Sequence, residues 1–327
     1  TNSKDSDRQA IQDEIDQLTT EIDRVSETTK FNETYLLKGE AGTKTINMKA
    51  HDAGLKGTLT DNGNGTATFV MDALNAGDKV SIGGKTYTIG STADEVKTEV
   101  GKLAKDNKFT VNGQEITIAD ATDAKAGKYA VADAKALVKD GATVKFGTDE
   151  YKVMTDGDTD GIDDTDASVI SKDVAYGLAS KELLAANQIG DTKGSAKVAN
   201  AGAKADGSFK ITTGQAEVAN SLSFSLHVGA DADMTNKIQV NIDAMDAASL
   251  GIKGLNVKDA SGNAATYAID AIADAVSKVS AQRSALGAVQ NRLEHTIANV
   301  DNVVENTTTA ESRIRDTDMA EEMVNYS

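Results

Sequence analysis

The C-terminal part of the chain carries a long run of apolar residues at alternating spacings of three and four. In an α-helix this spacing keeps one stripe of side chains on a single face, where a partner helix can cover it. Only two positions on the run are polar, Arg283 and Gln290. The run therefore predicts a long helix that packs in the manner of a coiled coil. Its positions are Ile269, Ile272, Val276, Val279, Arg283, Leu286, Gln290, Leu293, Ile297, Val300 and Val304.

The N-terminal segment shows the same rhythm over a shorter length. Ser6 followed by Gln9 fits a capping box, which predicts a helix start, and the pattern stops by Gly39. A second such pair, Thr308 with Glu311, predicts that a further helix begins near the C-terminus. We expect the two ends of the chain to pair as helices. The N-terminal stripe consists of Ile11, Ile15, Leu18, Ile22 and Val25.

Between the helical ends the composition shifts to Gly, Thr, Asp, Lys and Ala with short strand patterns. Alternating apolar residues at 222–228 and 238–242 predict a hairpin just before the long helix. The sequence therefore predicts a multidomain α+β fold, in which a discontinuous, coiled-coil-like helical domain with a β-hairpin carries a β-rich insertion with short helices. We expect the N-terminal part of the helical core at 1–40, the inserted domain or domains at 41–220, and the C-terminal part of the core at 221–327.

The insertion contains an internal repeat. Each copy predicts a hairpin with its turn near Gly83 or Gly147, and short helices are expected at 94–104 and 167–180. A further hairpin is predicted at 108–118, around the turn dipeptide Asn112-Gly113. We expect two related small α+β units. The repeat pairs Gly77, Val80, Ile82, Gly83, Tyr87 and Ile89 with Gly141, Val144, Phe146, Gly147, Tyr151 and Val153, each 64 positions later (141 − 77).

Composition excludes several classes of function. The 327 residues carry a net charge of −17, which disfavours binding to nucleic-acid phosphates, and there is no Cys for thiolate chemistry. No apolar run approaches the roughly 20 residues that cross a bilayer. The three histidines, His51, His227 and His295, show neither metal-ligand spacing nor a nucleophile motif. We predict a protein without a catalytic site and without a required cofactor.

One acidic loop resembles a cation site. Asp156, Asp158 and Asp160, followed by Gly161, match the front half of an EF-hand loop, in which carboxylates converge on Ca²⁺. The glutamate expected at the twelfth position is replaced by Ala167. A solvated acidic turn is the preferred interpretation, and a weak Ca²⁺ site is the alternative.

The residues on the helical stripes also resemble one family. The run QRSALGAVQNRLEHTI at 282–297 and the run AESRIRDTDMA at 310–320 are similar to the C-terminal core helix of bacterial flagellins. IQDEI at 11–15 and EIDRVS at 21–26, followed by Phe31-Asn32, are similar to the N-terminal core. The resemblance covers residues 1–40 and roughly 221–327, and the insertion falls where flagellins carry their variable outer domains, D2 and D3.

The resemblance implies a structural subunit of the extracellular flagellar filament. In flagellins the two ends form an inner helical domain, D1, that packs against neighbouring subunits, and further terminal helices, D0, drive polymerisation. The D0 segments have no counterpart in this sequence, so we expect the chain alone to be a monomer.

The resemblance also implies recognition of the inner domain by the innate immune Toll-like receptor 5. Five positions match the residue types of the recognised surface, whereas Leu18 stands where well-recognised flagellins carry Arg. The candidate receptor-binding residues are Glu14, Gln17, Leu18, Ile272, Val276 and Arg292.

The sequence leaves two other functions open for the insertion. An adhesin or glycan-binding module on a helical stalk would use exposed aromatics, and the insertion offers chiefly Tyr87, Tyr129, Tyr151 and Tyr176. A metalloprotease would need H-E-x-x-H, which the sequence lacks. Self-assembly is therefore the leading interpretation.

Overall fold

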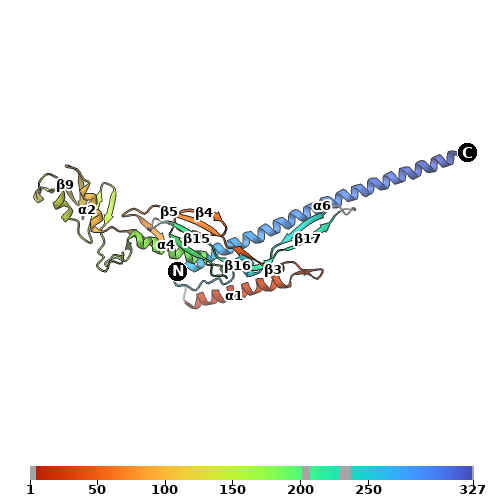
Figure 1. Ribbon diagram of the computed structural model, residues 1–327, viewed down its shortest axis with the longest axis horizontal. Helices are drawn as coiled ribbons and strands as arrows, with labels where there is room; N and C mark the ends of the chain where they lie inside the picture. The colour runs from red at the N-terminus through yellow and green to blue at the C-terminus, as the bar shows by residue number, and fades with distance from the viewer. Residues whose placement is uncertain (1–4, 201–206, 229–236, 326–327) are drawn as a thin grey trace. The chain divides into compact units, whose positions relative to one another are not determined.

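The computed structural model describes residues 5–200, 207–228 and 237–325 (Figure 1). The chain divides into two compact units, each assembled from three stretches of sequence. Both combine helices with small sheets, so the predicted α+β class is confirmed. The first unit comprises Thr1–Asp16, Thr45–Ala216 and Gly251–Ala271, and the second comprises Gln17–Lys44, Glu217–Leu250 and Ile272–Ser327. The division at 1–40, 41–220 and 221–327 stays a prediction.

The N-terminal helix, α1, spans Asp5–Thr28. Ser6 lies inside its first turn rather than ahead of it, and the side-chain amide of Gln9 donates to the carboxylate of Asp13 (2.6 Å). The predicted capping box at Ser6 is therefore wrong. The helix is followed by a two-stranded hairpin of β1 (Lys30–Phe31) and β2 (Thr34–Tyr35).

A four-stranded antiparallel sheet with the order β14-β15-β5-β4 holds one core of the first unit. Phe69 on β5 lies opposite Phe209 on β15, and their ring centroids are 6.4 Å apart. Tyr176 on helix α4 packs edge-on against Phe209, also at 6.4 Å, and all three side chains are buried. The bounds are β4 Gly57–Gly63, β5 Thr66–Met71, β14 Lys197–Asn200, β15 Ser208–Thr212 and α4 Lys172–Asn187.

The predicted repeat is confirmed, and it has three copies rather than two. The hairpin at 108–118 has the same geometry as the other two, because the amides of Gly77, Asp106 and Gly141 donate to the carbonyls of Ile89, Ile118 and Val153 at 2.7–2.9 Å. All three opening residues have positive φ. Asp106 occupies the position that is Gly in the other two copies. A comparison of residue types therefore did not detect the third copy. The hairpins are β6–β7 (Lys79–Ile82, Lys85–Ile89), β8–β9 (Lys108–Val111, Gln114–Ile118) and β11–β12 (Thr143–Phe146, Asp149–Lys152).

Each hairpin is completed by a short parallel segment that leads into a helix. The first hairpin pairs with β13 (Val169–Ile170), which precedes α4, and the second pairs with β10 (Lys128–Tyr129), which precedes α3 (Val131–Ala136). The third pairs through Val153 with Ser91, which precedes α2 (Ala93–Gly101). The helix that follows the first hairpin in sequence, α2, thus belongs with the third hairpin, and α4, which follows the third hairpin, belongs with the first. Residues 91–153 are therefore an interruption within the first copy.

The interrupting segment has its own core. Its sheet has the order β10-β9-β8-β11-β12, and a 3-10 turn, η1 (Ala124–Ala126), precedes β10. The apolar faces of α2 and α3 pack in the same cluster as this sheet. The predicted helix at 94–104 is confirmed, whereas the one at 167–180 begins later, at Lys172, because residues 169–170 form β13. The buried members are Val96, Val100, Phe109, Val111, Ile116, Ile118, Ala134, Val138, Ala142, Val144 and Val153.

The second unit contains the predicted hairpin, now β17 (Leu222–His227) and β18 (Lys237–Ile242), paired in register from Leu222↔Ile242 to His227↔Lys237. Its expected turn lies outside the described residues. One face of the hairpin packs on the long C-terminal helix through Leu286 and Val289. β3 (Glu40–Asn47) pairs with β16 (Gln215–Asn220), and a short helix, α5, spans Ala247–Leu250.

The C-terminal helix, α6, runs without interruption over Asn263–Asn325 (Figure 1). The hydroxyls of Thr307 and Thr309 donate to the carbonyls four residues earlier, at 2.7 and 2.8 Å, as threonine does inside a helix. The predicted helix start at Thr308 is therefore wrong, because the capping residues are absorbed into one continuous helix.

Candidate functional site

Helix α1 docks onto the rest of the chain through polar side chains. The side-chain amide of the buried Gln12 donates to the carbonyl of Leu255 (2.8 Å), and its oxygen accepts from the amide of Val257 (2.9 Å). Towards the other end of the helix, the Ser26 hydroxyl donates to the carbonyl of Leu37 (2.7 Å). These three bonds of α1 all go to backbone groups in non-helical segments.

This docking leaves three of the five predicted N-terminal stripe residues outside, whereas Ile15 and Ile22 are half-buried. Ile11, Leu18 and Val25 are all exposed, Leu18 to 57%. The buried positions Gln12 and Ser26 each follow a stripe residue directly, which is a rotation of about 100° around the helix. The sequence signal for this face is a polar residue every seven positions: Gln12, Thr19 and Ser26.

Helix α6 shows a one-residue offset in the opposite direction. Its first turns bury Ala268, Ala271 and Ala275, each one position before a predicted stripe residue. Further along, the Lys278 ammonium donates to the carbonyl of Ser249 (2.8 Å), and burial lowers the pKa of Lys278. Alanines and Tyr267 thus take the inner face of the first turns of α6, and the stripe residues Ile269, Ile272 and Val276 remain exposed.

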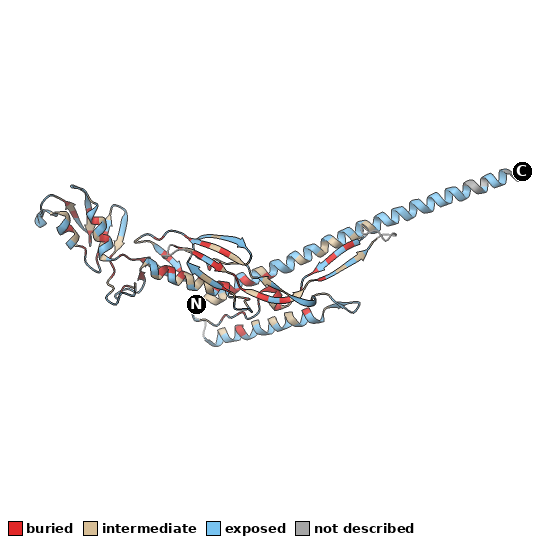
Figure 2. Cartoon of the chain, in the orientation of Figure 1, coloured by how far each residue is buried: buried red, intermediate tan, exposed pale blue. Residues whose placement is uncertain are grey.

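Beyond Leu286, the stripe on the C-terminal half of α6 is largely exposed among the described residues. Figure 2 shows the exposed colour continuing along the C-terminal half of the helix. Ile297 is 60% exposed and Val300 is 44% exposed. The pairing of the two ends through their stripes, which the sequence predicted, is not observed. The exposed members of the two predicted stripes, here called the outer stripes, are Ile11, Leu18, Val25, Ile269, Ile272, Val276, Val279, Ile297, Val300 and Val304.

The candidate receptor-binding residues are all exposed, three on α1 and three on α6. No hydrogen bond or ion pair joins the two groups within the described ranges. Recognition by Toll-like receptor 5 therefore stays a prediction. The residues are Glu14, Gln17 and Leu18 on α1, and Ile272, Val276 and Arg292 on α6.

The acidic loop gathers its three predicted ligands. Carboxylate oxygens of Asp156, Asp158 and Asp160 lie within 4.8 Å of one another. The Asp160 amide donates to the Asp158 carboxylate, and this bond lowers the pKa of Asp158. Desolvation and the neighbouring carboxylates raise the same pKa by more, so the pKa of Asp158 lies above its usual value. The same oxygens also close the loop, since Asp156 accepts from the amides of Asp160 and Gly161 (both 3.0 Å).

Asp163 in the same loop has a structural role. Burial alone would raise the pKa of its carboxyl, but the Thr165 hydroxyl and the amides of Thr155, Thr165 and Asp166 donate to it and bring the pKa below its ordinary value. These bonds measure 2.6–2.9 Å. Its oxygens are therefore engaged by the protein itself.

Across the described residues, none of the helices has the length and apolarity needed to traverse a bilayer. The exposed stripes lie on amphipathic helices that also carry charged faces.

Comparison with known proteins identifies the family. The sequence pattern described as the bacterial flagellin N-terminal helical region matches residues 1–42, and that of the C-terminal helical region matches residues 269–327. The chain is 32% identical to a flagellin of Clostridium tyrobutyricum over 98% of its own length and 67% of that protein. It is 42% identical to a flagellin of Bacillus subtilis over 37% of the chain and 45% of that protein.

A flagellin D of Vibrio cholerae is 28% identical over 98% of the chain and 64% of that protein. The chain thus spans about two thirds or less of the length of these relatives. It belongs to the bacterial flagellin family.

Proposed function

We propose that this chain is a structural subunit of the extracellular filament of the bacterial flagellum, with other flagellin subunits as its partners. The observation that carries the proposal is the pair of outer stripes on α1 and α6. Apolar side chains at helical spacing that find no cover in their own chain gain about 25 cal/mol for each Å² they bury on association.

The helical core and the insertion have different roles in such a subunit. The helices and the β17–β18 hairpin form a D1-like inner part that makes contacts between subunits. The β-rich insertion forms the D2/D3-like outer parts of the subunit. A glycan-binding role for the insertion gains no support, since Tyr176 is buried and Tyr87, Tyr129 and Tyr151 are partly buried against the two cores.

Assembly can be tested in a chimera. The matched region of the Clostridium tyrobutyricum flagellin is replaced by this chain and expressed in cells that lack their own flagellin. We expect filaments by electron microscopy, and we expect Val300→Asp to abolish them, because each copy would place a carboxylate in an apolar contact.

Asn302→Asp is the matched control. It introduces the same charge two residues later, on the opposite face of the helix, where the side chain is exposed. Filaments that form equally with Val300→Asp would show that the outer stripe does not join subunits. Loss of filaments with Asn302→Asp as well would assign the effect to charge alone.

For the acidic loop we propose, at most, weak Ca²⁺ binding. Three carboxylates converge there, but Ala167 supplies no bidentate ligand. We expect calorimetric titration to give a Kd of about 10⁻⁴ M or weaker, and Asp158→Asn to abolish the signal. A submicromolar Kd would contradict this interpretation.

A further inference from the structure

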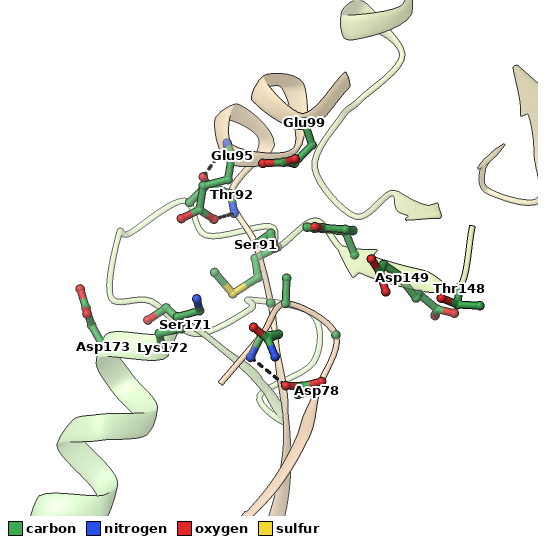
Figure 3. Close-up of a pocket in the computed structure, with 17 residues that line it drawn as sticks. Asp78, Ser91, Thr92, Glu95, Glu99, Thr148, Asp149, Ser171, Lys172 and Asp173 are labelled. Carbon is green, nitrogen blue, oxygen red and sulfur yellow. Dashed lines mark hydrogen bonds between the residues drawn. The ribbon is translucent and has the colours of Figure 1, made fainter. Parts of the chain in front are cut away.

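The insertion contains three Asn-Gly pairs, which are open to a reaction within the chain. The glycine nitrogen can bond to the side-chain carbonyl carbon of the asparagine, since glycine has no Cβ that blocks the approach. The asparagine side chain must turn toward that nitrogen, and the glycine amide must not already donate a hydrogen bond. The Thr92 amide, for example, is held in place by the carboxylate of Glu95 (2.8 Å; Figure 3). The pairs are Asn62-Gly63, Asn64-Gly65 and Asn112-Gly113.

Asn64 and Gly65 form the turn between β4 and β5. Both residues have positive φ, 53° and 72°, as a tight two-residue hairpin turn requires. The Asn64 side chain is exposed, and it makes no hydrogen bond to any of the described residues. The Gly65 amide likewise donates to no oxygen in the described part of the chain. Both reacting groups of this pair are therefore free to approach each other.

The pair Asn62-Gly63 is held at both of its reacting groups. The side-chain amide of Asn62 donates to the hydroxyl of Thr68 on β5 (2.8 Å). The Gly63 amide donates to the carboxylate of Asp61 (2.8 Å). The pair therefore reacts only after two hydrogen bonds have broken.

Asn112 provides the closest comparison with Asn64. Asn112 and Gly113 form a turn of the same kind, with φ values of 51° and 83°. The side-chain oxygen of Asn112, however, accepts from the amide of Thr143 on β11 (2.9 Å), and the Asn112 amide donates to the carbonyl of Thr143 (2.8 Å). These bonds fix the Asn112 side chain against the neighbouring strand, whereas nothing described in the chain fixes that of Asn64.

We propose that Asn64 is a site of deamidation in the folded chain. The Gly65 nitrogen bonds to the side-chain carbonyl carbon of Asn64, and the side-chain nitrogen leaves as ammonia with the proton of the Gly65 amide. One water then opens the resulting succinimide ring at either carbonyl, which gives aspartate or isoaspartate. The reaction involves neither α1 nor α6, so it is independent of the proposed filament function.

The test is incubation of the whole chain in mildly alkaline buffer, with and without urea, followed by tandem mass spectrometry of the three pairs. In the folded chain we expect Asn64 to deamidate about fivefold faster than Asn112 or more, the factor for one hydrogen bond that must break first. In urea the bonds are lost and the reacting dipeptide is the same, so the three rates should converge. Equal rates at Asn64 and Asn112 in the folded chain would overturn the proposal. A difference that persists in urea would assign the effect to the neighbouring sequence and would also overturn it.

Asp61→Ala combined with Thr68→Val is the matched variant, because it releases both reacting groups of Asn62-Gly63. We expect deamidation at Asn62 to rise toward the rate at Asn64, while the rate at Asn112 stays as it was. Thermal unfolding checks that the variant keeps the Tm of the unmodified chain. An unchanged rate at Asn62 at that Tm would show that these hydrogen bonds do not select the reacting pair, which contradicts the proposal.

Discussion

Replacing Phe209 by alanine is expected to lower the free energy of unfolding of the first unit by about 3–5 kcal/mol. Phe209 is fully buried in β15, opposite Phe69 on β5, and the Tyr176 ring packs edge-on against it. Removal of the ring opens a cavity between two aromatic partners, Phe69 on the sheet and Tyr176 on α4. The neighbouring strands cannot close it without breaking the pairing of β5 with β15.

Hydrogen exchange together with urea unfolding measures this effect. Amides of β5 and β15 should lose protection, while those of the C-terminal half of α6 should exchange as before. Lys210→Ala is the control, since Lys210 is the next residue on the strand and lies on its exposed side. A loss below about 1 kcal/mol would mean that the site collapses around the alanine, and that the aromatic cluster does not anchor the sheet.

Local patterns in the sequence were sufficient for several elements. The alternation at 222–228 and 238–242 predicted the hairpin that forms, and Asn112-Gly113 predicted a turn whose two residues both have positive φ. The third repeat was missed for a physical reason. Asp106 adopts the left-handed conformation that Gly77 and Gly141 adopt, so the shared backbone is invisible to a comparison of residue types.

The sequence predicted which apolar residues lie on the helical stripes, but it did not predict which surface covers them. The three-four rhythm correctly located the apolar stripes, yet it could not say whether they face the inside of this chain. On α6 the buried face contains Ala271 and Ala275, whose small side chains permit close packing. On α1 it contains Gln12, whose side chain bonds to backbone groups 243 residues or more away in the sequence. Such pairs carry no local signal in the sequence.

Replacing Gln12 by leucine is expected to cost about 2–4 kcal/mol, because two buried backbone groups lose their partners at once. The leucine fills similar space but can neither donate to the carbonyl of Leu255 nor accept from the amide of Val257. The amide of Val257 should then exchange with solvent faster. Thermal unfolding and hydrogen exchange measure the two consequences independently.

Gln9→Leu is the matched control, since Gln9 lies on the exposed side of α1 and loses only a surface bond to Asp13. Its effect should stay within about 0.5 kcal/mol. Gln12→Glu tests the bonding pattern itself. When protonated, the introduced carboxyl can donate to Leu255, and when ionised it cannot, so burial there raises its pKa in the folded state.

The sign of the pH dependence follows from that direction. The stability of the Gln12→Glu variant, relative to the unmodified chain, should be greatest below the unfolded pKa of about 4.3 and should fall as the pH rises through the folded pKa. A pH-independent difference would show that the carboxyl leaves the site for solvent. If the Gln12→Leu and Gln9→Leu variants were equally stable, water would have replaced the side-chain amide of Gln12. The remaining contacts of α1 would then be sufficient to hold the helix in place.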